Sequence, residues 1–207
     1  RIEAEEKKSI WANIKAMFSY QVGNVIVNHT DNILISLLIS TITVGFYSNY
    51  SMVVSSVNTF AMLIFTSVQA SIGNLAAKET AQRQYDVFRK LSVVGFCLTS
   101  FATVSFLTLF QDFITILYTD HYLLDFKVVI ACSLNFYMVN ILQPVYCYRN
   151  TVGLFKHTKR IMIYTAIVNI VLSVILGKIW GLFGILFATF LSRLVTNFWY
   201  EPIKLYR

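Results

Sequence analysis

The amino-acid sequence predicts an all-α, polytopic membrane protein. Hydrophobic residues make up 57% of the 207 positions and charged residues only 13%, whereas about 25% of the residues in a soluble domain are charged. Apolar runs such as 91–110 and 161–177 are continuous and do not alternate with polar residues. Such runs indicate helices that can cross a hydrocarbon core about 30 Å thick. In lipid only helices and closed barrels satisfy their own backbone hydrogen bonds, and the unbroken apolarity favours helices.

Hydropathy predicts six membrane-spanning helices, over residues 17–40, 45–74, 87–110, 127–148, 160–177 and 181–200. They form one domain over 17–200, which follows a cytoplasmic juxtamembrane segment over 1–16 and precedes a cytoplasmic tail over 201–207. The second run is longer than a straight crossing needs, so we expect it to tilt or project. Pro144 is expected to kink or end the fourth helix, and the glycines of GKIWG at 177–181 to make a tight reversal between the last two.

Basic residues alternate between the connections as the positive-inside rule predicts. They lie before the first helix, in the second and fourth connections and in the tail: Arg1, Lys7, Lys8 and Lys15; Lys78, Arg83, Arg89 and Lys90; Arg149, Lys156, Lys159 and Arg160; Lys204 and Arg207. The other connections contain only Lys127 and Lys178. We therefore expect an even number of crossings with both ends in the cytoplasm. We interpret the net charge of +7 as a consequence of the orientation of the helices in the membrane. Attraction of the basic connections to anionic membrane lipids is compatible with the same pattern. No nucleic acid is expected as a partner.

Asp31 is the only carboxylate that this assignment places away from a helix end. An ionised carboxylate at membrane depth costs about 2.5–3.5 kcal/mol on insertion scales, so it normally faces a bundle interior or a watery cavity. We expect it to titrate or to bind a cation. Asn24, Asn28 and Asp31 follow i, i+4, i+7 spacing and form one polar stripe, with Tyr20 one turn earlier. Alternatively the first span begins near Ile33, and Asp31 lies at an interface.

Further polar residues recur inside the apolar runs. Each is either an interhelical hydrogen-bonding group or part of a cavity wall; the candidates include Asn58, Asn169, Ser173, Thr189 and Asn197. Arg193 could hold a phosphate bidentately or extend to the cytoplasmic interface. The sequence contains no HExxH, GxSxG or Walker motif and no Asp-rich cluster, and its three cysteines lack metal-ligand spacing. A transporter without a resident cofactor is therefore favoured over an enzyme.

Several strings together resemble a known family. They are TDNILIS and VGFYSNY, then SIGNL with Glu79 and FRK behind it, then GLFKHTKR, NIVLSVILGKIWGLFGILFATFLSRL and WYEPIKLY. In order and spacing they resemble the C-terminal half of bacterial Wzx-type polysaccharide-repeat-unit flippases, which belong to the MATE-like multidrug/oligosaccharidyl-lipid/polysaccharide (MOP) exporters. The resemblance covers nearly the whole chain.

The resemblance implies a MATE-like transporter built from two six-helix lobes, of which this chain is the second and an N-terminal lobe of the same protein is its partner. The implied protein lies in the bacterial cytoplasmic membrane, as a multi-pass protein. The implied substrate is an undecaprenyl-diphosphate-linked oligosaccharide repeat, moved to the outer leaflet for O-antigen or capsule synthesis with the help of an ion gradient. The closest alternative is a MATE-type drug or metabolite exporter; a membrane polymerase or acyltransferase is a second.

Residue roles also follow from the resemblance. The cation site of related flippases would correspond to Asp31, to Asn169 with Ser173, and to Thr189 with the carbonyl of Ile185. Because Ser173 stands where that pattern has a second carboxylate, H⁺ on Asp31 is at least as strong a candidate coupling ion as Na⁺. The residues expected to line the substrate path are Asn24, Asn28, Asn58, Arg149, Arg193 and Asn197, with Arg149 or Arg193 holding the diphosphate.

Overall fold

The computed structural model describes the backbone of residues 4–152 and 155–205, and the side chains of residues 10–151 and 160–204. Arg1 and Arg207, as well as the side chains of Lys7, Lys8, Lys156 and Lys159, lie outside this description. The described elements are α1 (Ala4–Leu38), α2 (Thr41–Lys78), α3 (Ala81–Tyr118), the short 3₁₀ helix η1 (Asp120–Tyr122), α4 (Phe126–Ile141), α5 (Gln143–Val152), α6 (Phe155–Val195) and α7 (Asn197–Leu205). The described residues contain no strand, which confirms the all-α class.

Four segments of the described chain are long and apolar enough to cross a membrane: Thr41–Lys78, Ala81–Tyr118, Phe126–Thr151 and Arg160–Lys204. A membrane protein is thus indicated, whereas the predicted count of six crossings is not confirmed. Two features account for the difference. The polar stripe through Asn24, Asn28 and Asp31 dilutes the apolarity of α1, which is absent from these four. The segment Arg160–Lys204 counts once although it reverses direction at Gly181.

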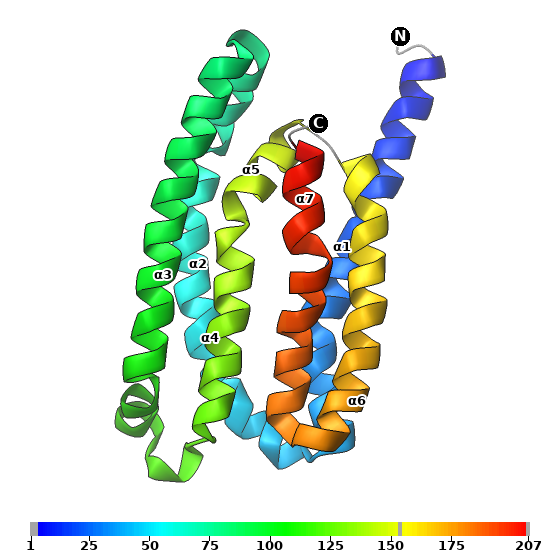
Figure 1. The fold of residues 1–207 in the computed structure, drawn as a ribbon. Coiled ribbons are helices and arrows are strands. Elements are labelled where there is room, and N and C mark those ends of the chain that lie inside the picture. The colour runs from blue at the N-terminus through cyan, green and yellow to red at the C-terminus, as the bar shows by residue number, and fades with distance from the viewer. Residues whose placement is uncertain (1–3, 153–154, 206–207) are drawn as a thin grey trace.

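Helix α6 consists of two antiparallel limbs, residues 155–180 and 182–195, which we call the first and second limb. Gly181 between them has φ 61° and ψ −138°, a conformation that residues with a Cβ rarely adopt. The Nδ2 of Asn169 in the first limb donates to the Oγ1 of Thr189 in the second limb at 2.8 Å. The two limbs therefore pack against each other on either side of Gly181. Figure 1 shows the limbs side by side, with the second leading into α7. The reversal predicted at 177–181 is confirmed.

Helices α2 and α3 form a long hairpin. Each begins with a hydroxyl side chain that caps it: Ser40 accepts from the backbone N–H of Thr43 at 3.1 Å, and Thr80 from that of Arg83 at 3.4 Å. At 38 residues each the helices are about 57 Å long, well beyond a hydrocarbon core of about 30 Å. The hairpin accordingly projects past α5 and α7 at one end of the bundle (Figure 1), in agreement with the long second run of the sequence.

The break between α4 and α5 follows from Pro144. Helix α4 ends at Ile141 and α5 begins at Gln143, because the ring of Pro144 cannot donate a backbone hydrogen bond to the preceding turn. The kink packs on α3 at Gly95, where a Cβ would lie only 3.3 Å from Cγ of Pro144 and 3.1 Å from Cζ of Phe65. Glycine at this position therefore allows the close approach of α3.

The apolar core lies between α2, α3, α4 and the second limb. Its buried members are Tyr50, Phe106, Phe110, Ile114, Val128, Val129, Ala131, Cys132, Phe136 and Leu186. Helix α1 packs chiefly against α6, where Gly23 meets the backbone of Met162. The start of α1 and the end of α7 lie at the same end of the bundle (Figure 1), and Tyr20 of α1 reaches Glu201 of α7 in a hydrogen bond described next.

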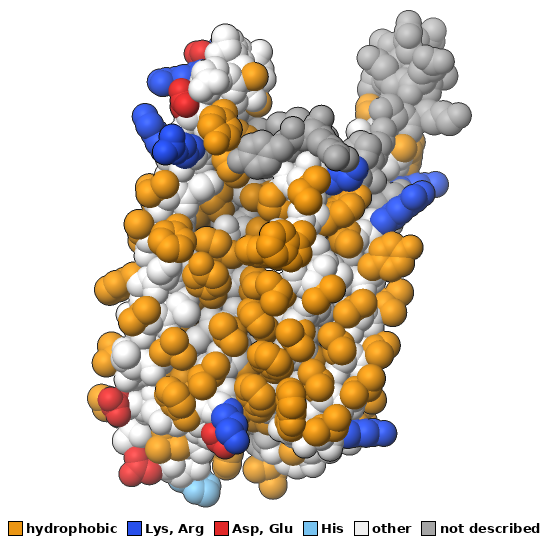
Figure 2. Space-filling model, viewed as in Figure 1, with side chains coloured by type: hydrophobic (Ala, Val, Ile, Leu, Met, Phe, Trp, Pro, Cys, Tyr) orange, Lys and Arg blue, Asp and Glu red, His pale blue; other side chains and the backbone are white. Residues whose placement is uncertain are grey.

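The surface carries a wide apolar belt. Many large hydrophobic side chains are exposed, among them Phe18, Phe60, Phe101, Ile116, Val195 and Trp199. Figure 2 shows hydrophobic side chains spread over the middle of the visible face, with charged side chains near its two ends. An exposed apolar area of this extent between charged ends suits a hydrocarbon environment and not water.

Candidate functional site

A seam of polar pairs joins α1 to the second limb and α7. Thr189 contacts Asp31, Arg193 contacts Asn28, and Glu201 contacts Tyr20. Thr189, Arg193, Asn197 and Glu201 are spaced by four residues, so they share one face of the helical path. The pairs follow one another in antiparallel order. We call Tyr20, Asn28, Asp31, Thr189, Arg193, Asn197 and Glu201 the α1 seam, and it contains five of the eleven predicted site residues.

Asp31 lies at the far end of the seam from the chain termini, in a short hydrogen-bonded chain. The hydroxyl of Thr189 lies 2.9 Å from both carboxylate oxygens of Asp31 and accepts a hydrogen bond of 2.8 Å from Nδ2 of Asn169. Asp31 is 7% exposed and Asn169 is fully buried. The carboxylate therefore points into the bundle, between α1 and both limbs of α6, and not toward the apolar surface.

Two oxygens near this chain have no hydrogen-bond partner among the described residues. They are Oδ1 of Asn169 and Oγ of Ser173, which follow one another on one face of the first limb. A buried polar atom without a partner is costly, and such atoms commonly bind a water or an ion. Of the five predicted ion-coupling residues, Asp31, Asn169 and Thr189 meet directly. Ser173 and Ile185 are fully buried, each one turn from a member of that group.

A small cavity adjoins Asp31. Its volume is about 110 Å³, and its wall includes Val27, Asn28, Asp31, Tyr47, Ser51, Val54, Cys132, Asn135, Leu186, Thr189 and Arg193. Asn135 donates to the carbonyl of Leu186 at 2.7 Å, and its buried Oδ1 has no partner among the described residues. Asn169 and Ser173 do not line the cavity. The space is large enough for a few waters or an ion and too small for an oligosaccharide.

Arg193 and the asparagines of α1 extend the site away from Asp31. The Nη2 of Arg193 donates to Oδ1 of Asn28 at 2.6 Å, and Nδ2 of Asn28 donates to the side chain of Asn24 at 2.9 Å. Arg193 is 8% exposed, so it lies inside the bundle and does not extend to an interface. Its charge faces the same cavity as the carboxylate of Asp31.

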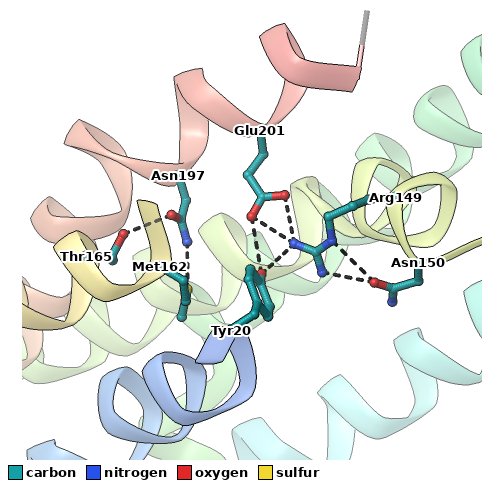
Figure 3. A network of polar contacts seen from close by, with 7 residues as sticks. All are labelled: Tyr20, Arg149, Asn150, Met162, Thr165, Asn197 and Glu201. Carbon is teal, nitrogen blue, oxygen red and sulfur yellow. Dashed lines mark hydrogen bonds and ion pairs between the residues drawn. The ribbon is translucent and has the colours of Figure 1, made fainter. Parts of the chain in front are cut away.

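A second polar centre lies at the other end of the seam (Figure 3). The Nη1 of Arg149 lies 2.8 Å from both carboxylate oxygens of Glu201 and donates to Oη of Tyr20 at 2.6 Å. Its Nε and Nη2 donate to Oδ1 of Asn150 at 3.3 and 3.1 Å. The guanidinium also lies 4.2 and 4.7 Å from the ring centres of Tyr20 and Tyr146. We call Tyr20, Arg149 and Glu201 the arginine cluster.

The arginine cluster bears on the role expected for Arg149. Its side chain is 6% exposed and that of Glu201 is 0% exposed, so the ion pair is sheltered from water. A diphosphate could reach the guanidinium only by displacing Glu201. The structure thus places Arg149 in a link between α5, α7 and α1, and Arg193 is the more accessible of the two arginines to a ligand in the cavity.

The remaining predicted residues lie apart from Asp31. Asn197 accepts a hydrogen bond from Thr165 at 2.9 Å and donates to Sδ of Met162 at 3.4 Å, as Figure 3 shows. It links α7 to the first limb. Asn58 accepts a hydrogen bond of 2.9 Å from Asn140, which links α2 to α4 outside the seam.

Sequence reasoning placed Tyr20 one turn before the polar stripe without giving it a partner, and it missed Glu201 as a member of a buried centre. Glu201 falls in the segment 201–207 that was expected to be a tail, yet α7 continues through it to Leu205. The missed signal is the four-residue spacing that continues from Thr189 to Glu201. A proline at position 202 suggests a helix end, yet it lies inside α7.

Comparison of the chain with protein-family models, with curated proteins and with solved structures finds no match. Within the described residues no group of three or more His, Cys, Asp or Glu side chains could hold a metal ion. The site around Asp31 consists of one buried carboxylate, one buried guanidinium beside it, and neutral oxygens on both limbs of α6.

Proposed function

We propose that the chain forms one six-helix lobe of an ion-coupled flippase, which moves undecaprenyl-diphosphate-linked oligosaccharide repeat units across the bacterial cytoplasmic membrane. The crossings would be α1, α2, α3, α4 with α5, the first limb, and the second limb with α7. The observation that carries the proposal is the buried carboxylate of Asp31, held by Thr189 beside a water-sized cavity. The resemblance to Wzx-type flippases supplies the substrate class.

Coupling follows from the contacts of Asp31. An ionised carboxylate accepts the hydroxyl proton of Thr189 and attracts the charge of Arg193. Once neutral, it loses the attraction and weakens its hold on Thr189. The packing of α1 on the second limb then differs in free energy between the two protonation states. An ion can shift a conformational equilibrium only through such a difference in affinity.

The residues around Asp31 fit a proton more simply than a sodium ion. Protonation requires no rearrangement of Thr189 or Asn169. A cation held between them would use the unpartnered oxygens of Asn169 and Ser173, but the hydroxyl of Thr189 would have to turn its proton away from the carboxylate. With a single carboxylate, such a site also has little charge to hold a cation. We therefore propose H⁺ as the coupling ion, with Na⁺ as the alternative to be tested.

The substrate needs a wet route, because each unpaired polar group in hydrocarbon costs several kcal/mol. The cavity of about 110 Å³ cannot hold a diphosphate with several sugars. In this proposal the head group therefore passes between this lobe and its N-terminal partner lobe, while the prenyl chain stays in lipid. Arg193 is placed to attract the diphosphate when Asp31 is neutral.

The test combines cells and vesicles. A strain without the protein should lose its surface glycan, and the wild-type gene should restore it. Asp31→Asn should fail to restore it, whereas Asp112→Asn, an exposed acid on α3, should succeed. Altered drug sensitivity with intact glycan would favour a MATE-type exporter. In vesicles, unchanged transport by Asp31→Asn at every pH and sodium concentration would reject the coupling role.

A further inference from the structure

A long apolar groove lies between α3 and α7, away from Asp31. Its volume is about 550 Å³, and its wall consists of Arg89, Ser92, Val93, Phe96, Ile141, Leu142, Val145, Phe198, Trp199, Pro202 and Ile203. None of these residues lines the cavity at Asp31. The groove is thus a separate feature of the bundle, within the size range of about 300–1,000 Å³ that is typical of ligand sites.

The backbone explains the shape of this groove. Arg89, Ser92, Val93 and Phe96 follow helical spacing on one face of α3, and the four residues of α7 follow it on the facing wall. The floor is the break between α4 and α5 at Leu142. Both α3 and α7 pack on α5, which keeps the walls apart. From Arg89 to Phe96 the groove runs about 10 Å along α3, which is within one leaflet of a bilayer about 30 Å thick.

The mouth of the groove is positively charged. A shallow depression next to it is lined by Arg83, Asp86, Arg89, Lys90, Val93 and Val94, so three cations stand against one carboxylate. Among the described residues the only ion pair is that of Arg149 with Glu201, and the three cations are in none. Arg89 and Lys90 are exposed. Arg89 belongs to both the groove and the depression, which places a positive charge at one end of an apolar channel.

We propose that this groove binds an anionic glycerophospholipid, with one acyl chain between α3 and α7 and the phosphate at Arg89. A ligand with a negative head and an apolar chain matches both parts of the site. This inference rests on the membrane location of the bundle and does not depend on the flippase activity.

The experiment uses Trp199, which lines the groove. The protein, with Trp199 as its only tryptophan, is reconstituted in vesicles that contain phosphatidylglycerol or phosphatidylcholine with brominated acyl chains, which quench tryptophan fluorescence on contact. We expect phosphatidylglycerol to bind about fivefold more tightly than phosphatidylcholine, since one basic residue near an anionic lipid contributes a ratio of this size. Arg89→Gln should reduce this preference to about one.

Two further variants and one competitor complete the test. Lys178→Gln removes an exposed cation outside the groove and should leave the preference unchanged. Ser92→Phe should fill the groove and reduce quenching by both lipids. Equal quenching by both lipids in the parent protein would overturn the proposal, and so would absence of quenching, which would mean that protein covers the groove. Displacement by farnesyl diphosphate but not by unlabelled phosphatidylglycerol would overturn it in favour of a prenyl diphosphate.

Discussion

Asp31 and Thr189 are 158 residues apart in the sequence, yet a single hydroxyl lies 2.9 Å from both oxygens of the carboxylate. The contact joins the first described helix to the second limb of α6. A change in the charge of Asp31 therefore changes the electrostatic interactions of a helix that also carries Arg193.

Thr189→Val should impair coupling while keeping the shape of the side chain. The variant removes the only side-chain donor that contacts Asp31 among the described residues, and a hydrogen bond to a charged group contributes about 1.5–3 kcal/mol. We expect ion-driven transport to fall by about tenfold or more. Thr189→Ser, which keeps the hydroxyl, should retain most of the activity. Equal transport by the Val and Ser variants in vesicles with an imposed ion gradient would contradict a role for this hydroxyl.

Glu201→Gln should destabilise the protein, because the buried positive charge of Arg149 then has no carboxylate partner. Breaking a buried ion pair by removing one partner typically costs about 3–5 kcal/mol. The double variant Arg149→Met with Glu201→Gln should recover part of this loss, because no unpaired charge remains buried. The measurement is a double-mutant cycle on unfolding in detergent micelles. If Arg149 instead serves the substrate, the single variant would bind a prenyl diphosphate at least as tightly as wild type.

Gly181→Ala and Gly45→Ala should have opposite effects on stability. A Cβ at either position meets nothing within 4 Å, so only the backbone differs. Gly181 has φ 61° and ψ −138°, a backbone conformation in which a residue with a Cβ costs about 1–3 kcal/mol. Gly45 lies inside α2, where alanine is favoured over glycine by about 0.5–1 kcal/mol. Unfolding free energies that shift in the same direction for both variants would contradict the reversal at Gly181.

Cysteines at positions 90 and 178 should be labelled from opposite sides of the membrane. In the proposed topology, Lys90 follows two crossings and Lys178 follows five, so the two face different compartments. The native Cys97, Cys132 and Cys147 are first replaced by alanine or serine. A membrane-impermeant maleimide, added to intact cells and then to inverted vesicles, reports the side of each position. Labelling of both from one side would rule out the six-crossing arrangement.

Sequence alone predicted the helical membrane class and the local breaks at Pro144 and Gly181, because these depend on composition and on single residues. The stripe from Asn24 to Asp31 was also predictable, since side chains at i, i+4 and i+7 share a face whatever packs against them. The partners of that stripe were not predictable from periodicity. They come from residues far along the chain, and only the packing of α1 on the second limb brings them within hydrogen-bond distance.

Glu201 shows the limit of hydropathy most clearly. A window average treats a charged residue near a proline as the end of a span, whereas burial of that carboxylate depends on Arg149 from another helix. The count of crossings is affected in a similar way. The polar residues of α1 lower its mean hydropathy, and a scale that ignores direction cannot recognise that Asp31 is buried inside the bundle.

The spacing of the α1 seam gives it a second possible register. Translation of α1 by one turn, about 5.4 Å, in the direction that brings Asn28 to Thr189 would also bring Asn24 to Arg193 and Tyr20 to Asn197. Polar groups would again face polar groups, except that Asp31 would face Leu186. A carboxylate tolerates such an apolar neighbour only after it has taken up a proton. The charge on one side chain would then decide which of two discrete positions a whole helix occupies.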